Sequence, residues 1–237
     1  MKYNFDKLYD FAKQYEIEIT EKQIEQLFVF YEMLIEKNKV MNLTAITEFD
    51  EVLTKHFIDS ISLIQVCNLK KDIKILDMGT GAGFPGIPLK IIFPEIEICL
   101  ADSLNKRILF IDEVIDRLGL KKIHTVHARA EDLAMNKEYR EKFDVVVSRA
   151  VANLSTLSEY CVPFVKIGGK FISYKSGEVL EEVESSKSAV FLLGGKIVDV
   201  HNFLIDDNKR SFIIIEKKQG TPKKYPRKAG VPSKKPL

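Results

Sequence analysis

Apolar residues recur at helical spacing through the first 70 residues of the chain. Thr20 and Gln23 match the capping-box pattern, in which a threonine caps a helix and a glutamine three positions later reaches back to it. The apolar residues that follow are spaced so that they form one face of an amphipathic helix. These residues are Ile24, Leu27, Phe28, Tyr31, Leu34 and Ile35. With a further helix expected over residues 51–66, residues 1–70 are predicted to form a helical segment packed on a core.

Short β-rich runs alternate with helical segments in residues 71–217, which are predicted to form the main domain. Helices are expected after residues 86, 104, 153 and 177. This alternation indicates a mostly parallel sheet with helices on both faces. The predicted strands of this part cover residues 73–78, 96–102, 122–127, 143–149 and 170–175.

Two further apolar runs, 196–205 and 210–217, are separated by only four polar residues, 206–209. Strands joined so closely cannot be parallel without a crossover, so they are predicted to form an antiparallel hairpin. The expected fold class is therefore α/β and Rossmann-like. Its mostly parallel seven-stranded sheet, ending in an antiparallel hairpin, is typical of class I S-adenosylmethionine-dependent methyltransferases, here with an N-terminal helical extension.

The most informative motif is LDMGTGAGFPGIPL, residues 76–89, which follows a predicted strand and opens a helix. Its glycines allow a tight turn and let a ligand approach the backbone. Within it, residues 81–86 also fit G-x-G-x-x-G, the dinucleotide fingerprint, and Asp102 ends the next strand where an acid binds ribose hydroxyls. An NAD-dependent oxidoreductase is therefore one alternative.

Two features of the motif favour a methyltransferase over that alternative. Asp77 and an extra Gly79 precede the fingerprint, and D-x-G-x-G-x-G is the usual form of the first methyltransferase motif. Pro85 and Pro88 remove backbone N–H donors where a pyrophosphate would need them. S-adenosylmethionine carries no phosphate, so the loss of these donors does not disfavour it.

Composition argues against a membrane protein, a secreted protein and a metal-binding protein. In 237 residues, 46% of them hydrophobic, no run approaches the roughly 20 apolar residues of a membrane span. The N-terminus carries acidic and aromatic residues from its start, unlike a signal peptide. The widely separated cysteines Cys67, Cys99 and Cys161 predict neither a metal site nor a disulfide framework. A cytoplasmic protein without membrane or metal partners is expected.

The charge of the chain is unevenly distributed. Residues 217–237 hold eight of the 36 Lys and Arg and no Asp or Glu, which leaves 28 basic against 34 acidic residues, a net charge of −6, in 1–216. A cationic end suggests a polyanionic partner, although a solvated tail that only keeps the protein soluble fits equally well. Four prolines also lie there, so residues 218–237 are predicted to be an unpacked basic tail. Deleting the tail should then weaken RNA binding and leave cofactor binding unchanged. The RNA-binding candidates are Lys223, Lys224, Arg227 and Lys228.

Several motifs together resemble one family. LDMGTGAGFPGIPL is followed by LADSLNKR (100–107), ARAEDL (128–133) and VSRAVANL (147–154). The chain thereby resembles the bacterial small-subunit (16S) ribosomal RNA guanine-N7 methyltransferases, the glucose-inhibited division protein B family. MNLTAI (41–46), KHFIDSI (55–61) and GTPKKYPRKAG (220–230) look like the same family, so the resemblance covers nearly the whole chain.

The resemblance implies methyl transfer from S-adenosylmethionine to N7 of a guanine in the decoding-region loop of small-subunit ribosomal RNA. It implies that Gly79, Gly81 and Phe84 line the cofactor and that Asp102 holds its ribose. Ala130 and Glu131 are implied at the adenine. Arg149 is implied at the methionine end and the incoming base, as the residue that positions the reaction. A monomer is the default for this fold type, and naked RNA and an assembled ribosomal particle both stay open as substrates.

The expected chemistry needs no general base, because guanine N7 carries a free lone pair at neutral pH and catalysis can rest on alignment. Cys161 lies on a predicted helix beyond the loop after residue 149, where it is a poor nucleophile for cytosine methylation.

Some of these residues also have structural interpretations. Arg149 could pair with Asp77 or Glu131 instead of acting at the reacting base. His56 and Asp59 share one helical face that could border the substrate cleft or be a plain polar face. A non-catalytic, cofactor-sensing RNA-binding protein is the remaining alternative.

Overall fold

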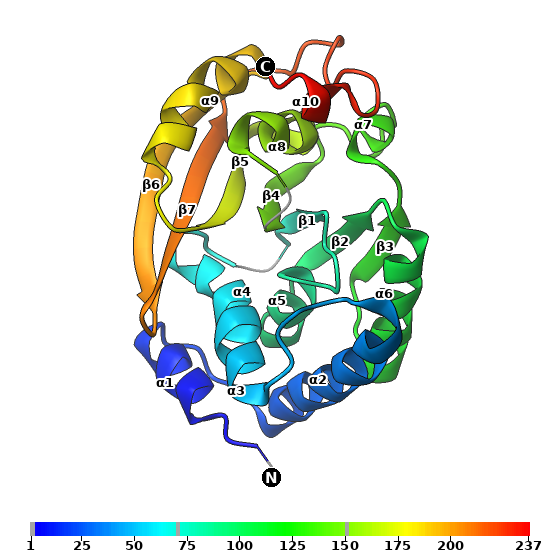
Figure 1. Ribbon diagram of the computed structural model, residues 1–237, viewed down its shortest axis with the longest axis vertical. Coiled ribbons are helices and arrows are strands. Elements are labelled where there is room, and N and C mark those ends of the chain that lie inside the picture. The colour runs from blue at the N-terminus through cyan, green and yellow to red at the C-terminus, as the bar shows by residue number, and fades with distance from the viewer. Residues whose placement is uncertain (1–2, 70–71, 150–151) are drawn as a thin grey trace.

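A seven-stranded sheet lies between two layers of helices in the computed structural model, which describes residues 3–69, 72–149 and 152–237 (Figure 1). The strand order is β3-β2-β1-β4-β5-β7-β6. Neighbours from β3 to β5 pair in parallel, and β7 is antiparallel to both β5 and β6. The predicted parallel sheet with a terminal antiparallel pair is confirmed. The strands are β1 Lys74–Met78, β2 Glu97–Asp102, β3 Ile123–His127, β4 Phe143–Arg149, β5 Val165–Ser176, β6 Gly195–Ile205 and β7 Asn208–Lys217.

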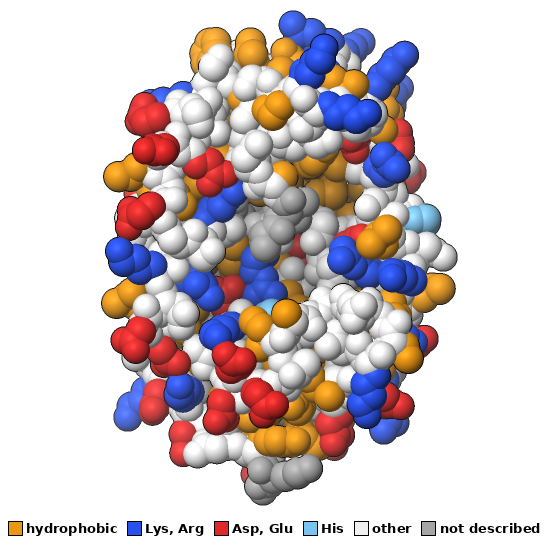
Figure 2. Space-filling view, in the orientation of Figure 1, with side chains coloured by type: hydrophobic (Ala, Val, Ile, Leu, Met, Phe, Trp, Pro, Cys, Tyr) orange, Lys and Arg blue, Asp and Glu red, His pale blue; other side chains and the backbone are white. Residues whose placement is uncertain are grey.

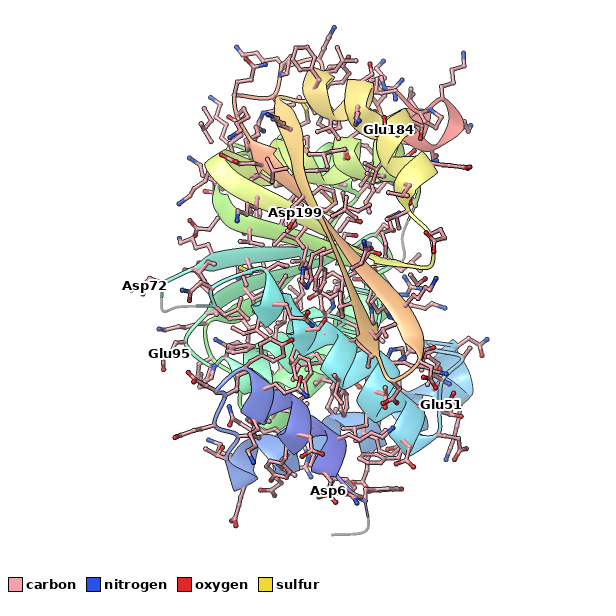
Figure 3. The ribbon with its side chains drawn as sticks, turned by 90° about the vertical axis from the view of Figure 1, so that its left-hand side faces the viewer. Asp6, Glu51, Asp72, Glu95, Glu184 and Asp199 are labelled. Atoms are coloured by element: carbon pink, nitrogen blue, oxygen red, sulfur yellow. The ribbon has the colours of Figure 1, made fainter. Side chains whose placement is uncertain are left out.

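The terminal hairpin is tighter and longer than its sequence indicated. The predicted four-residue connection shrinks to residues 206 and 207, because the pairing of Ile205 with Asn208 extends both strands. The hairpin of β6 and β7 extends toward the N-terminal helices (Figure 3). At its turn, Asp206 accepts a hydrogen bond from Lys7 at 2.8 Å. The turn thereby contacts the start of the chain.

The N-terminal helices cover one face of the sheet together with two helices of the main domain (Figure 1). The capping box is present as predicted, since Thr20 Oγ1 accepts from the backbone N–H of Gln23 and the Gln23 side chain accepts from that of Thr20. The helix expected over 51–66 is there, but it contains a π-helical stretch, Leu53–Ile58, between short α-helical and 3₁₀ turns. The elements of this layer are α1 Asp6–Gln14, α2 Glu21–Met41, α3 Phe49–Val52, α4 Asp59–Ile61, the 3₁₀ turn Ser62–Gln65, α5 Gly86–Ile92 and α6 Asn105–Leu118.

One apolar cluster joins this helical layer to the sheet. Leu27 and Phe30 of α2 are fully buried, as are Ile75 of β1 and Ile98 of β2 in the same cluster. Each fully buried side chain of this size contributes about 1.5–3 kcal/mol through removal of apolar surface from water. The N-terminal segment therefore shares its core with the sheet.

The other face of the sheet carries further helices and a second apolar cluster. Cys161 lies fully buried at the end of α8, and all three cysteines are free and buried, as small core residues are. The elements here are α7 Ala130–Leu133, α8 Leu154–Cys161, the 3₁₀ turn Val162–Phe164, α9 Leu180–Leu192 and α10 Val231–Lys234.

The prediction of an unpacked C-terminal tail was wrong. Thr221, Tyr225 and Pro232 are buried, and Tyr225 belongs to the second apolar cluster. The guanidinium of Arg140 donates to the backbone carbonyls of Thr221 at 2.8 Å and Tyr225 at 3.0 Å. The tail is fixed by partners elsewhere in the chain, and its own composition carries no sign of them.

Candidate active site

A cleft of about 620 Å³ opens at the carboxyl ends of the parallel strands. Figure 2 shows the hollow near the middle of this face, with basic side chains along its walls. In open α/β sheets ligands bind at this edge, where the strand order reverses, here between β1 and β4, and the volume suits a small-molecule site. All of the predicted cofactor residues line it. They are Gly79, Gly81, Phe84, Asp102, Ala130, Glu131 and Arg149.

Two glycines of the loop after β1 serve different purposes. A Cβ at Gly86 would lie 2.1 Å from a methyl carbon of Leu100, so this position must be bare for the loop to pack on β2. A Cβ at Gly81 would meet no atom within 4 Å, and Gly81 has a φ of +63°, a conformation that suits glycine. Gly86 therefore fixes the loop, whereas Gly81 presents bare backbone toward open space.

Asp77 supports this loop from beneath and does not line the cleft. Its Oδ2 accepts from the Thr80 hydroxyl at 2.6 Å and from the Gly86 N–H at 2.9 Å, while its buried Oδ1 has no partner among the described residues. Burial raises the pKa of Asp77 to about 7, against the lowering effect of these two hydrogen bonds. The carboxyl acts as a structural acceptor that holds the two ends of the loop together.

Asp102 ends β2 and joins two loops at the cleft. Its Oδ2 accepts from the Gly81 N–H at 3.0 Å and lies 3.3 Å from Arg107 Nη1. Its Oδ1 accepts from the Leu104 N–H at 2.9 Å. The side chain is 3% exposed, so it lines the cleft in a fixed orientation, as a ribose-binding acid requires.

Arg149, at the end of β4, is held by the N-terminal helices. Its Nη1 donates to Asp59 Oδ2 at 2.9 Å and to the Lys55 carbonyl at 3.1 Å, and its Cζ lies 5.0 Å from the centre of the Phe84 ring. Asp59 Oδ1 also accepts from Arg210 Nε at 2.8 Å. The suggested pairings with Asp77 or Glu131 were wrong, because Asp59 is the partner carboxylate.

His56 lines the cleft beside Arg149. Nδ1 of His56 lies 3.2 Å from Arg149 Nη2 and 3.1 Å from the Lys55 carbonyl oxygen, and Nε2 lies 2.9 Å from Thr44 Oγ1. Burial, and then the charge of Arg149, lowers the pKa of His56 to about 3. The ring stacks on Phe84 with centroids 4.5 Å apart. Of the two residues predicted on one helical face, His56 lines the cleft and Asp59 lies behind Arg149.

One wall of the cleft comes from an unexpected part of the chain. Gly230 and Ser233 of the C-terminal tail line it beside Tyr160 of α8. The Gly230 N–H donates to Glu131 Oε1 at 2.9 Å across 99 positions of sequence. Sequence reasoning missed these three residues. A signal existed for Gly230 alone, because it ends the segment 220–230, which shares the family resemblance with the cleft motifs.

The predicted RNA-binding residues lie outside the cleft. Lys223, Lys224 and Lys228 are exposed to solvent. Arg227 is half-buried, and its guanidinium is paired with Glu159. Ala150, beside Arg149 in the sequence, lies outside the described residues.

Two kinds of feature are absent from the part of the chain that the structure describes. No helix there is both long and apolar enough to cross a bilayer. No group of three or more His, Cys, Asp and Glu in that part is placed to hold a metal ion.

The family model and the sequence relatives indicate one family. Residues 23–213 match the family described as "rRNA small subunit methyltransferase G". The chain is 53% identical over 223 residues to the ribosomal RNA small subunit methyltransferase G of Lachnoclostridium phytofermentans, covering 93% of this chain and 92% of that protein. It is 47% identical over 235 residues to that of Clostridium novyi, covering 98% and 97%.

Solved structures with low sequence identity share the fold. TrmN from Thermus thermophilus matches with a TM-score of 0.53 and 14% identity, covering 70% of this chain and 53% of that one. TYW2 of M. jannaschii in complex with AdoMet matches with a TM-score of 0.53 and 16% identity, covering 67% and 74%. The predicted class I methyltransferase fold is confirmed.

Proposed function

This chain belongs to the rRNA small subunit methyltransferase G family, and we propose that it transfers a methyl group from S-adenosylmethionine to N7 of a guanine in small-subunit (16S) ribosomal RNA. The observation that carries the proposal is 53% identity with a member of that family over 93% of the chain. The relatives are methyltransferases, so the oxidoreductase alternative is set aside. We place the reaction in the cytoplasm, where free buried cysteines stay reduced.

The residues of the cleft suit this cofactor. S-adenosylmethionine, when bound, supplies the methyl group as an electrophile. Gly79 and Gly81 would let it approach bare backbone, and Asp102 would accept hydrogen bonds from its ribose hydroxyls. Glu131, beside Ala130, would hold the adenine end. The cofactor has no phosphate, so the absence of backbone N–H donors at Pro85 and Pro88 does not weaken its binding.

The methyl acceptor needs alignment more than proton transfer. Guanine N7 attacks through a lone pair that bears no proton, and we assign Arg149 and Phe84 to positioning the base. His56 lies beside both of these residues, with Nδ1 3.2 Å from Arg149 Nη2 and its ring stacked on Phe84. With its pKa near 3, His56 is a weak base at neutral pH.

The RNA would be attracted by the exposed lysines of the tail, Lys223, Lys224 and Lys228, which supply phosphate contacts without sequence information. Arg227 would contribute less, because its guanidinium is bound by Glu159. We propose that the enzyme acts as a monomer, the default for this fold type.

The direct test is methylation in vitro. The protein is incubated with methyl-labelled S-adenosylmethionine and, in separate arms, deproteinised small-subunit RNA and assembled small subunits. We expect one methyl group per RNA, at a guanine N7 that becomes sensitive to reductive strand cleavage. The arm with the higher rate identifies the substrate. Label on an exocyclic amine, or cofactor binding without transfer in either arm, would contradict the proposal, and the second result would support the cofactor-sensing alternative.

A further inference from the structure

The C-terminal tail lies against the same end of the cleft as Glu131. Gly230 and Ser233 line the cleft together with Leu157 and Tyr160 of α8. A ligand at this end would contact a wall that the parallel sheet and its loops do not supply. Figure 1 shows α10 beside α7 and α8 at the top of the molecule.

Three hydrogen bonds dock the last turn of the tail. Gly230 N–H donates to Glu131 Oε1 at 2.9 Å, the Thr156 hydroxyl donates to the Pro232 carbonyl at 3.1 Å, and the Ser155 hydroxyl donates to the Leu237 carbonyl at 2.9 Å. The first of these bonds uses one oxygen of Glu131 and fixes the orientation of the carboxylate. The tail therefore positions a residue of the proposed adenine site as well as lining it.

A buried ion pair holds the tail in place before it reaches the cleft. Glu159 of α8 is 0% exposed and accepts from the backbone N–H of Arg227 at 2.7 Å and from Nη2 at 2.6 Å. A carboxylate in such a place is strongly destabilising without its partner, so α8 requires the tail to be docked. Beyond the pair, Gly230 adopts a φ of +80°, which turns the chain toward Glu131.

We propose that Gly230 and Ser233, held in place by the docked tail, are part of the cofactor site, so that retention of S-adenosylmethionine depends on the docked tail. This inference rests on the proposed function. It replaces the sequence-based expectation that deleting the tail leaves cofactor binding unchanged, and it is compatible with phosphate contacts by the exposed lysines. A ligand in a site of this kind buries most of its surface, and removing one wall exposes part of it to water.

The first experiment truncates the chain after Ala229, which removes the wall and keeps the Arg227–Glu159 pair. Two positive charges, Lys234 and Lys235, are lost with it. The matched control is the full chain carrying Lys234→Gln and Lys235→Gln, which loses the same charges and keeps the wall. In calorimetry, the truncated chain should bind S-adenosylmethionine about tenfold more weakly than wild type. The control should bind it with an affinity within about twofold of wild type. Equal affinity in the truncated chain, or an equal loss in the control, would overturn the inference.

The second experiment uses wild-type protein, so it does not depend on the folding of a variant. If the docked tail tightens cofactor binding tenfold, the cofactor must stabilise the docked tail by the same factor. Trypsin cleaves after exposed Lys228 when the tail opens, and saturating S-adenosylmethionine should slow this cleavage about tenfold relative to cleavage after Lys187 in α9. Cofactor binding without protection would refute the inference, whereas no cofactor binding at all would refute the proposed function.

Discussion

Replacing Asp59 by asparagine should lower the free energy of unfolding, because the carboxylate is buried between two arginines. Asp59 is 4% exposed and bonds two guanidinium groups, Arg149 Nη1 at 2.9 Å and Arg210 Nε at 2.8 Å. Removing one partner of a buried ion pair costs about 3–5 kcal/mol. Asparagine keeps one acceptor oxygen, so we expect the free energy of unfolding to fall by about 3 kcal/mol, near the lower end of that range.

The assay is urea denaturation of wild type and Asp59→Asn, with Asp206→Asn as the matched control. Asp206 also pairs with a basic side chain, Lys7, but both side chains are about half exposed, and such pairs contribute at most about 1 kcal/mol. In a chain of this length, 3 kcal/mol corresponds to a fall in Tm of roughly 6–12 °C. A loss in Asp59→Asn no larger than in Asp206→Asn would show that the two arginines do not need this carboxylate.

Further changes test the cleft itself. Asp102→Ala should weaken S-adenosylmethionine about tenfold to a hundredfold in calorimetry, and unchanged affinity in a folded variant would remove Asp102 from the site. The pKa of Asp77 rises from 3.8 to about 7 on folding, so its contribution to stability is full at low pH and is lost as pH rises from about 4 to about 7. Urea denaturation of Asp77→Asn should lack that fall, and an unaltered pH slope would contradict the shift. Arg149→Lys keeps the charge but loses the planar fork, so single-turnover methylation should slow about a hundredfold with little change in cofactor affinity. The wild-type single-turnover rate should stay nearly flat from about pH 6 to 8.5, because His56, with a pKa near 3, stays neutral there; a tenfold rise per pH unit would mean that a general base exists.

Structural features that are set by residues close together in the chain could be predicted from the sequence alone. The capping box, the alternation of strands and helices and the closing hairpin are set by spacing over a few residues, and each is present in the structure. The glycine loop is also a local feature. Gly86 lies where the chain packs closely on β2, and Gly81 lies where the backbone faces open space. The predicted cofactor residues of the strand ends converge because parallel strands bring their carboxyl ends to one edge.

The partners of charged residues were decided only by the tertiary structure. Arg149 pairs with Asp59, 90 positions away, and Arg227 with Glu159, 68 positions away. In the sequence these arginines look like any other basic residues, and the tail of residues 218–237 looks solvated because it is rich in lysine and proline. Whether such a segment packs depends on buried acceptors supplied elsewhere, here Glu159 and Glu131. Local pattern therefore determined the elements and the glycine loop, whereas long-range packing decided which charges meet and which segment closes the cleft.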